Sequence, residues 1–173
     1  TEKKFLDGFA RHYKTGKPMP QELIDRFVKA SRFGAAYSCM RQLGFGYLDM
    51  AYYTLTEPMR ASADVEEFEK NAQNPVRVFD AVEGCMTSPS FGHIFSGGYA
   101  AGYYGYKWAE ALDADAFAAF KEKGIFDKTT ARKFRKMLQS GGTVDPMELY
   151  IEFRGHKPGI EALLERDGIN TDK

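Results

Sequence analysis

The stretch that decides the fold runs from residue 91 to residue 108 and reads FGHIFSGGYAAGYYGYKW. Its second half has helical spacing, since four side chains fall at positions i, i+4, i+7 and i+11: Tyr99, Tyr103, Tyr106 and Glu110. At about 100° per residue, these side chains share a stripe about 60° wide on one face of a helix. We therefore predict a helix over residues 98–123, with Tyr104 and Trp108 on the opposite, packed face.

Four glycines mark the same stretch. Gly97 and Gly98 precede the predicted helix, while Gly102 and Gly105 lie inside it, where each costs roughly 1 kcal/mol relative to alanine. A helix accepts this cost where a ligand or another backbone must approach closely. Periodicity alone favours tyrosines that are core aromatics with satisfied hydroxyls. The glycines bring a second interpretation, in which the tyrosines contact a ligand, to about equal standing.

Neutral hydroxyls suit one particular chemistry. A tyrosine has a pKa near 10 and remains a hydrogen-bond donor at working pH. Two or three donors on one face can stabilise the negative charge that develops on a peptide carbonyl under attack. The stretch itself contains no nucleophile and no base.

The rest of the chain also has helical periodicity, and alternating strand patterns are essentially absent. Residues 145–148, Asp-Pro-Met-Glu, form a helix start signal, and the helix that follows is expected to end at Gly155. Prolines and glycines predict an irregular segment over residues 73–96. Further helices are predicted over residues 3–13, after Pro20, and over residues 35–55, 64–71, 129–138 and 158–166. The fold class is all-α, in a single helical domain over residues 1–173.

Composition excludes several classes of function. The 173 residues carry 24 Lys plus Arg and 24 Asp plus Glu, so the formal net charge is zero and gives no support for a nucleic-acid or membrane partner. No apolar run approaches the length of a membrane span, and we expect no signal peptide. Cys39 and Cys85 fit no zinc-site spacing and are expected to be reduced, which favours a cytoplasmic location.

No metal site can be assembled from local motifs. The histidines are His12, His93 and His156, and none belongs to a His-Glu-x-x-His helix. His12 and His156 are interpreted as surface residues, whereas His93 lies just before the glycine pair. Glu110, Asp113 and Asp115 are interpreted as a solvated helix face rather than a cation site.

Residues 91–117 closely resemble the C-terminal region of the thimet-oligopeptidase-like zinc metallopeptidases, of the bacterial peptidyl-dipeptidase and oligopeptidase A type. The resemblance continues through GIF at residues 124–126, SGG at 140–142, DPMELY at 145–150 and FRG at 153–155. Upstream it includes FARHY at residues 9–13, GKPMP at 16–20 and LDMA at 48–51. It therefore covers nearly the whole chain.

The resemblance implies the C-terminal part of a helical neurolysin/thimet-oligopeptidase-like zincin fold, with a channel that admits short peptides. Tyr99 and Tyr106 match tyrosines that contact substrate and stabilise the tetrahedral intermediate, so they are the predicted catalytic residues. Tyr103 and His93 match substrate-binding residues. Gly97 and Gly98 match a flexible loop that lets the tyrosines close on bound peptide, and they complete the predicted substrate-binding set.

The resemblance also implies what this chain lacks. In that family two histidines and a downstream glutamate hold zinc, and the glutamate of the His-Glu-x-x-His motif activates a zinc-bound water. These residues are expected ahead of Thr1, in a longer parent protein that binds zinc. We predict that this chain binds no metal, is inactive alone, and acts on short peptides together with that zinc-binding part. The alternative is a non-catalytic helical peptide-binding or scaffold module, in which the tyrosine hydroxyls are buried.

Overall fold

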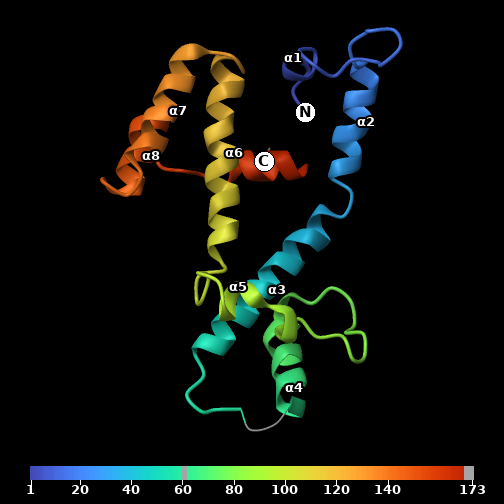
Figure 1. Ribbon diagram of the computed structural model, residues 1–173, viewed down its shortest axis with the longest axis vertical. Helices are drawn as coiled ribbons and strands as arrows, with labels where there is room; N and C mark the ends of the chain where they lie inside the picture. Colours follow the sequence, from blue (N-terminus) through green and yellow to red (C-terminus); the bar gives the residue numbers. More distant parts are fainter. Residues whose placement is uncertain (60–61, 170–173) are drawn as a thin grey trace. The chain divides into compact units, whose positions relative to one another are not determined.

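The computed structural model describes residues 1–59 and 62–169, and the regular secondary structure in these ranges is helical. One isolated antiparallel bridge joins Arg11 and Pro18. The predicted all-α fold class is therefore confirmed (Figure 1).

The chain divides into two compact units. The central unit is Gly34–Ala109, and the terminal unit combines Thr1–Phe33 with Glu110–Lys173. The single domain expected over residues 1–173 stays a prediction, and residues 60–61 and 170–173 of that range lie outside the described part.

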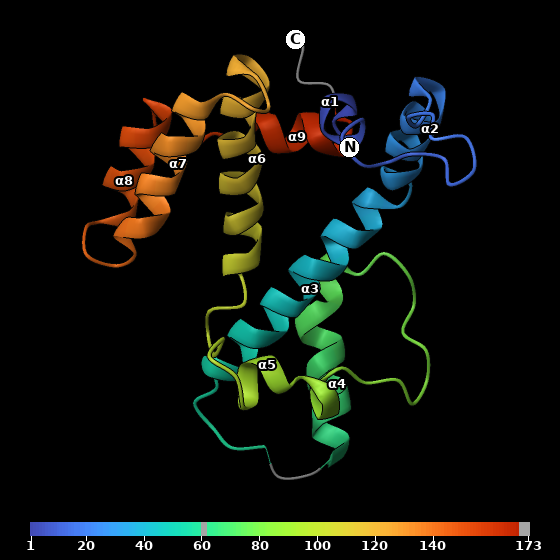
Figure 2. The same cartoon turned by 45° about the horizontal axis from the view of Figure 1, so that its top comes forward.

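The central unit is built on two helices that lie side by side, α3 (Ala35–Tyr53) and α4 (Ser62–Gln73) (Figures 1 and 2). Two short 3₁₀ helices, η1 (Asn74–Val76) and η2 (Ser88–Ser90), and the single-turn α5 (Gly92–Phe95) follow. The core of this unit joins α3 to residues 91–103, and its buried members are Leu48, Phe91, Ile94 and Tyr103. Packing of α5 against α3 therefore fixes the segment that the sequence singled out.

The terminal unit contains α1 (Lys3–Leu6), α2 (Gln21–Ser31), α7 (Lys128–Ser140), α8 (Pro146–Arg154), α9 (Glu161–Asp167) and most of α6 (Gly105–Lys123). Helices α7 and α8 lie side by side (Figure 1).

The start and end signals of α8 work as predicted. Asp145 accepts hydrogen bonds from the backbone N–H groups of Met147 and Glu148 at 2.8 and 3.2 Å, and Pro146 opens the helix. Gly155 ends it with a φ of 87°, a left-handed conformation that glycine adopts without steric cost.

The helix predicted over residues 3–13 is too long. It ends at Leu6, and the chain then forms a narrow turn instead. In this turn the N–H of His12 donates to the carbonyl of Lys17 at 2.9 Å, and the N–H of Met19 donates to that of Ala10 at 3.0 Å. Gly16, with a φ of 67°, allows the reversal, so these hydrogen bonds replace those of another helical turn.

A buried ion pair corrects our interpretation of the acidic residues on α6. Asp115 is 6% exposed, so it does not belong to a solvated face. Its carboxylate accepts two bonds from the guanidinium of Arg154, at 3.1 and 3.3 Å, and one from the hydroxyl of Tyr150 at 2.5 Å. Burial by itself raises the pKa of Asp115, but these hydrogen bonds and the charge of Arg154 outweigh it and lower that pKa below its ordinary value.

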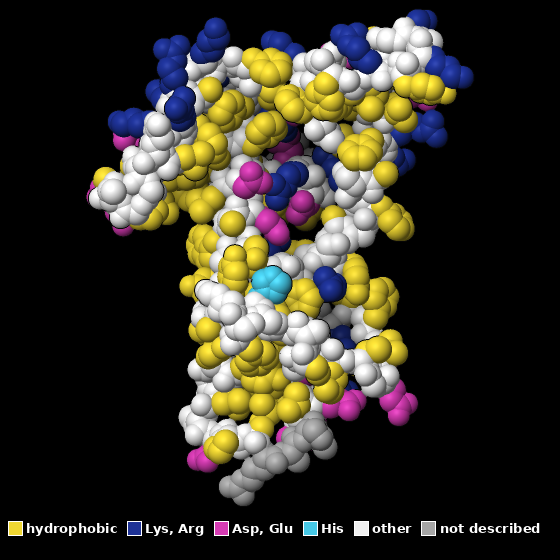
Figure 3. Space-filling model, viewed as in Figure 1, with side chains coloured by type: hydrophobic (Ala, Val, Ile, Leu, Met, Phe, Trp, Pro, Cys, Tyr) yellow, Lys and Arg dark blue, Asp and Glu magenta, His cyan; other side chains and the backbone are white. Residues whose placement is uncertain are grey.

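Many large apolar side chains are exposed, and hydrophobic side chains are visible in many places on the face drawn in Figure 3. Those before residue 34 include Phe9, Tyr13, Leu23, Phe27 and Phe33. Within residues 1–59 and 62–169, no helix combines the length and the apolar character needed to cross a membrane.

We expect Asp115→Asn to lower the free energy of unfolding by about 1.5–3 kcal/mol at neutral pH, because the Arg154 guanidinium would lose its buried partner and keep only Glu122, a more exposed carboxylate 3.2 Å away. The matched control is Asp113→Asn on the same helix. The Asp113 carboxylate pairs with Arg166 at 2.8 Å, but the two side chains are 72% and 44% exposed, so we expect a loss of at most about 1 kcal/mol. Urea unfolding followed by circular dichroism measures both, and equal losses would contradict the prediction.

The stability contributed by Asp115 also depends on pH. Because its pKa is lower in the folded than in the unfolded chain, the contribution is fully present above the unfolded value and is lost as the pH falls through the folded value. We therefore expect the difference in unfolding free energy between the natural chain and Asp115→Asn to shrink in acid. A difference that grows towards low pH would contradict the assignment.

Candidate functional site

Four aromatic side chains of the central unit meet in one cluster: His93, Tyr99, Tyr103 and Tyr106. The rings of Tyr99 and Tyr106 are stacked, with centroids 5.2 Å apart. The ring of Tyr103 lies 5.0 Å from that of Tyr106 and 6.3 Å from that of Tyr99. The His93 ring lies 5.9 and 5.8 Å from the rings of Tyr99 and Tyr103. The structure therefore brings together the four aromatic residues that the sequence selected.

The route by which the tyrosines meet differs from our prediction. The predicted helix over residues 98–123 was wrong at its start, since α6 begins at Gly105 and leaves Tyr99 and Tyr103 in the preceding turns. These turns are closed by hydrogen bonds from the N–H of Gly102 to the carbonyl of Tyr99, at 2.9 Å, and from the N–H of Gly105 to that of Gly102, at 3.0 Å. The cluster therefore arises from a folded loop and not from a helical stripe.

A buried carboxylate explains why the helix starts late. Asp49 on α3 is completely buried, and its two oxygens accept the backbone N–H groups of Ala101 and Tyr103, each at 2.9 Å. Ala101 has a φ of 53°, in the left-handed region that a helix excludes. The N–H groups that would have entered helical bonds are thus bound by a side chain from another element.

The tyrosines differ in exposure. Tyr99 and Tyr106 are 41% and 36% exposed, whereas Tyr103 is buried against Phe45 and Phe91. Tyr103 therefore supports the two exposed rings from behind. The opposite face was expected to be packed, but Tyr104 and Trp108 are mostly exposed. That expectation was wrong, because Tyr103 packs into the core of the central unit and Tyr104 and Trp108 do not.

Gly97 and Gly98 have different steric surroundings. A Cβ at position 97 would lie 2.7 Å from the backbone oxygen of His93, which is too close for any side chain. A Cβ at position 98 would meet nothing within 4 Å. Position 97 therefore requires glycine for a close backbone approach, and nothing nearby restricts position 98.

Three further side chains hold the segment before the cluster. The carboxylate of Glu69 on α4 accepts the N–H groups of Thr87 and Ser88 at 2.6 and 2.8 Å, and the Ser88 hydroxyl at 2.6 Å. The hydroxyl of Tyr52 donates to that of Ser88 at 2.7 Å, and the hydroxyl of Tyr53 donates to the carbonyl of Ile94. Residues 87–103 are therefore fixed to α3 and α4 at both ends and near the middle.

Sequence reasoning missed Asp49 and Glu69. Each acts through hydrogen bonds to residues at least 18 positions away, which no local pattern reveals. A signal did exist for Asp49, since it is the one acid on an otherwise largely apolar helical stretch over residues 43–51. A carboxylate at such a position needs partners inside the protein.

The electrostatic environment of these groups follows from their partners. The hydrogen bond with Tyr99, aided by partial burial and by the nearby phenols, raises the pKa of Tyr106 above 10. Burial alone raises the pKa of Glu69, but the hydrogen bonds from Ser88 and Thr87 outweigh it and lower that pKa. At neutral pH the Tyr106 hydroxyl therefore stays protonated and the Glu69 carboxylate stays ionised.

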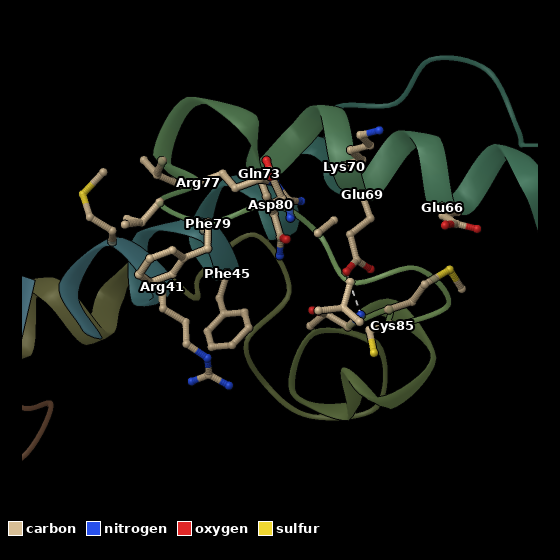
Figure 4. A pocket seen from close by; sticks show the side chains of 18 of the residues that line it. Arg41, Phe45, Glu66, Glu69, Lys70, Gln73, Arg77, Phe79, Asp80 and Cys85 are labelled. Carbon is tan, nitrogen blue, oxygen red and sulfur yellow. Dashed lines mark hydrogen bonds between the residues drawn. The ribbon is translucent and has the colours of Figure 1, made fainter. Parts of the chain in front are cut away.

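A separate pocket of about 460 Å³ lies between α3, α4 and residues 77–87 (Figure 4). Arg41 and Phe45 reach it from α3, Glu66 and Glu69 from α4, and Cys85 from the following segment. It contains none of the predicted site residues. It shares Phe45 and Glu69 with the side chains that support the tyrosine cluster and the segment before it.

The described residues do not fit a metal centre. Over residues 1–59 and 62–169, no group of three or more His, Cys, Asp or Glu side chains is arranged to hold a metal ion. All three histidines are exposed, and the neighbours of His93 include the aromatic rings of Phe91, Tyr99 and Tyr103. Cys39 and Cys85 are both free thiols. No catalytic step through a metal can be derived from these residues.

We expect Tyr99→Phe to lower the pKa of Tyr106 towards 10, because the substitution removes the hydroxyl that stabilises the protonated phenol. Titration of ¹³Cζ-labelled tyrosine by nuclear magnetic resonance measures this change. Tyr104→Phe is the matched control, since the exposed Tyr104 lies outside the cluster and its loss should leave Tyr106 unchanged. An unaltered Tyr106 titration in Tyr99→Phe would contradict the geometry of the cluster.

Comparison with known proteins identifies relatives along nearly the whole chain. Oligopeptidase A from Haemophilus influenzae is 40% identical over an alignment that covers 97% of this chain and 25% of that protein. The probable cytosolic oligopeptidase A of Arabidopsis thaliana is 38% identical, with 95% and 24% covered. A dipeptidyl carboxypeptidase from Salmonella typhimurium is 37% identical, with 96% and 25% covered.

The chain thus spans about a quarter of the length of the curated relatives it matches. The sequence profile of peptidase family M3 matches residues 1–169. These residues include the whole tyrosine cluster and its supports on α3 and α4, so the resemblance found in the sequence is confirmed. The chain belongs to peptidase family M3.

Proposed function

We propose that this chain is the substrate-contacting, transition-state-stabilising C-terminal part of a zinc metallopeptidase that cleaves short peptides. The observation that supports the proposal best is the stacked pair formed by Tyr99 and Tyr106. Their exposed rings carry two hydroxyls at one place, next to His93, on a segment that buried groups hold in position. Membership of peptidase family M3 supplies the reaction class, namely hydrolysis of a peptide bond.

In this proposal the hydroxyls of Tyr99 and Tyr106 donate hydrogen bonds to the peptide carbonyl oxygen as it becomes negatively charged. The raised pKa of Tyr106 keeps its phenol protonated at neutral pH, so its one proton is available for donation when the peptide oxygen takes the place of the Tyr99 hydroxyl. Donors held in place before the reaction are effective because little reorganisation is needed when the charge develops.

The remaining predicted residues have roles in substrate binding. His93 and the backbone around Gly97 and Gly98 are exposed beside the two donors, so we assign them contacts with the peptide on either side of the scissile bond. Tyr103 is the least exposed of the three tyrosines. Its direct contact with substrate stays a prediction, and its ring also supports Tyr99 and Tyr106.

The zinc of the family belongs to another part of the protein in this proposal, because the described residues hold no ligand set. That part would supply the metal and the general base, and this chain alone would be inactive. The exposed apolar residues before position 34 fit a surface that such a part covers. We also propose a cytosolic location, as named for one of the plant relatives.

The alternative is a non-catalytic helical module that binds peptides or acts as a scaffold. It requires buried tyrosine hydroxyls, and the burial of Tyr103 favours it to that extent. The exposure of Tyr99 and Tyr106 favours the catalytic proposal, because a structural aromatic pair has no need to face solvent.

Reconstitution tests the proposal. This chain is mixed with Haemophilus influenzae oligopeptidase A from which the region matching the chain has been removed, and cleavage of a quenched short peptide is followed. We expect no cleavage by either piece alone, and chelator-sensitive cleavage by the mixture. Cleavage by this chain alone, or an inactive mixture in which both pieces are folded, would count against the proposal.

Within the reconstituted enzyme, we expect Tyr106→Phe to lower kcat by about 100- to 1000-fold with little change in KM, since the lost donor acts on the transition state. Tyr104→Phe is the matched control and should leave both constants unchanged. A normal kcat for Tyr106→Phe would remove the catalytic role of this hydroxyl.

A further inference from the structure

The carboxylate of Asp49 has an unusual position for an acid. Asp49 lies on α3, is completely inaccessible to solvent, and is 52 residues away from the nearer of its two partners, Ala101. Oδ1 accepts the N–H of Ala101 and Oδ2 accepts that of Tyr103, each at 2.9 Å. Hydrogen bonds from N–H groups to an ionised carboxylate are about twice as strong as those between neutral groups.

The two hydrogen bonds constrain both α3 and the loop over residues 101–103. A carboxylate that lost these partners inside the core would be strongly destabilised, so α3 in this position requires the loop to stay in place. The loop in turn requires the carboxylate, because Ala101 has a φ of 53°, which costs an alanine on the order of 1–2 kcal/mol. Two N–H groups that converge on one anion, with a residue in the left-handed region, form a backbone anion-binding nest.

The nest shares one residue, Tyr103, with the cluster. Tyr103 provides one of the N–H groups, and its ring contacts those of His93, Tyr99 and Tyr106. Its carbonyl also accepts the N–H of Tyr106 at 3.2 Å, which fixes the first turn of α6. A shift of the Tyr103 backbone would therefore move every other ring in the cluster.

We propose that Asp49 is a positioning residue for the tyrosine hydroxyls: its buried carboxylate fixes the backbone of residues 101–103 so that Tyr99 and Tyr106 stack with both hydroxyls at the same place. Asp49 does not touch substrate in this scheme. It acts through the Tyr103 backbone and ring. The catalytic part of the inference depends on the function proposed above, whereas the structural part stands on the chain by itself.

The test compares Asp49→Asn with Asp115→Asn in the full chain. An asparagine keeps one acceptor oxygen but turns an NH₂ group towards the second N–H, so only one of the two loop hydrogen bonds can form. Asp115→Asn is matched to it, since it also removes a charge from a buried, multiply hydrogen-bonded carboxylate, but in the terminal unit. It controls for a general loss of stability.

The first measurement uses nuclear magnetic resonance on the chain alone. In Asp49→Asn we expect the nuclear Overhauser effects between the Tyr99 and Tyr106 rings to disappear, and amide exchange at Ala101 and Tyr103 to speed up by about tenfold. Amides of α3 should keep their protection, which shows that the variant is folded. Asp115→Asn should keep the ring contacts. Unchanged ring contacts and exchange in Asp49→Asn would overturn the proposal.

If Asp49→Asn fails to fold, the natural chain decides the matter. Amides of Ala101 and Tyr103 that are protected from exchange and shifted downfield by the carboxylate support the nest. Exchange of both amides at the rate of an unprotected peptide overturns it.

The second measurement uses the reconstituted enzyme. There we expect Asp49→Asn to lower kcat by about 100-fold while KM changes by less than about threefold, because displaced donors fail mainly in the transition state. Asp115→Asn should leave kcat unchanged. An unchanged kcat for Asp49→Asn, with Tyr106→Phe impaired, overturns the positioning role. If Tyr106→Phe is also unimpaired, the proposed function fails, and the measurements on the chain alone then decide whether Asp49 orders the cluster.

Discussion

The burial of one carboxylate in the central unit, that of Asp49, sets the conformation of the loop that carries the tyrosines. Asp49 is completely removed from water, and this is tolerable only because two peptide N–H groups replace the lost solvent. Those groups belong to residues 101–103. These residues therefore do not form the helical hydrogen bonds that their sequence favours. Their bonds to Asp49 instead fix the positions of the loop's aromatic side chains relative to α3.

The same device recurs at two other places. Glu69 accepts the N–H groups of Thr87 and Ser88 and fixes the beginning of the segment that Asp49 fixes at its end. In the terminal unit, Asp115 pairs with Arg154 and so joins α6 to α8. In each case a carboxylate on a helix accepts hydrogen bonds from N–H groups in a distant part of the chain, so that neither the acceptor nor the donors are left without a partner. The helices provide the rigid elements, and their carboxylates determine which other segments are hydrogen-bonded to them.

This arrangement suits a surface that must present donors without moving them. The exposed rings of Tyr99 and Tyr106 are backed by the buried ring of Tyr103, which packs on Phe45 and Phe91. The cluster offers neutral hydroxyls and an imidazole, but no ligand set for a metal among the described residues. In a member of peptidase family M3, such a surface is suited to binding substrate and stabilising charge. The function we propose gives these two tasks to this chain and assigns the metal and the general base to another part of the protein.

The sequence by itself determined the all-α class, the capped boundaries of α8, membership of the family, and which four aromatic residues gather. The fold class and the boundaries of α8 follow from local rules of spacing and capping, whereas the family and its four aromatic residues follow from motifs that lie in continuous stretches. Only the tertiary structure decided that Tyr99 and Tyr103 leave the helix, that Tyr103 and not Tyr104 is packed, and that Asp115 is buried. The reason is physical: those outcomes depend on hydrogen bonds from the N–H of Ala101 to Asp49 and from Arg154 to Asp115, which join residues 52 and 39 positions apart. Periodicity describes how residues are spaced along one element, and it gives no information about a hydrogen-bond partner that comes from another element.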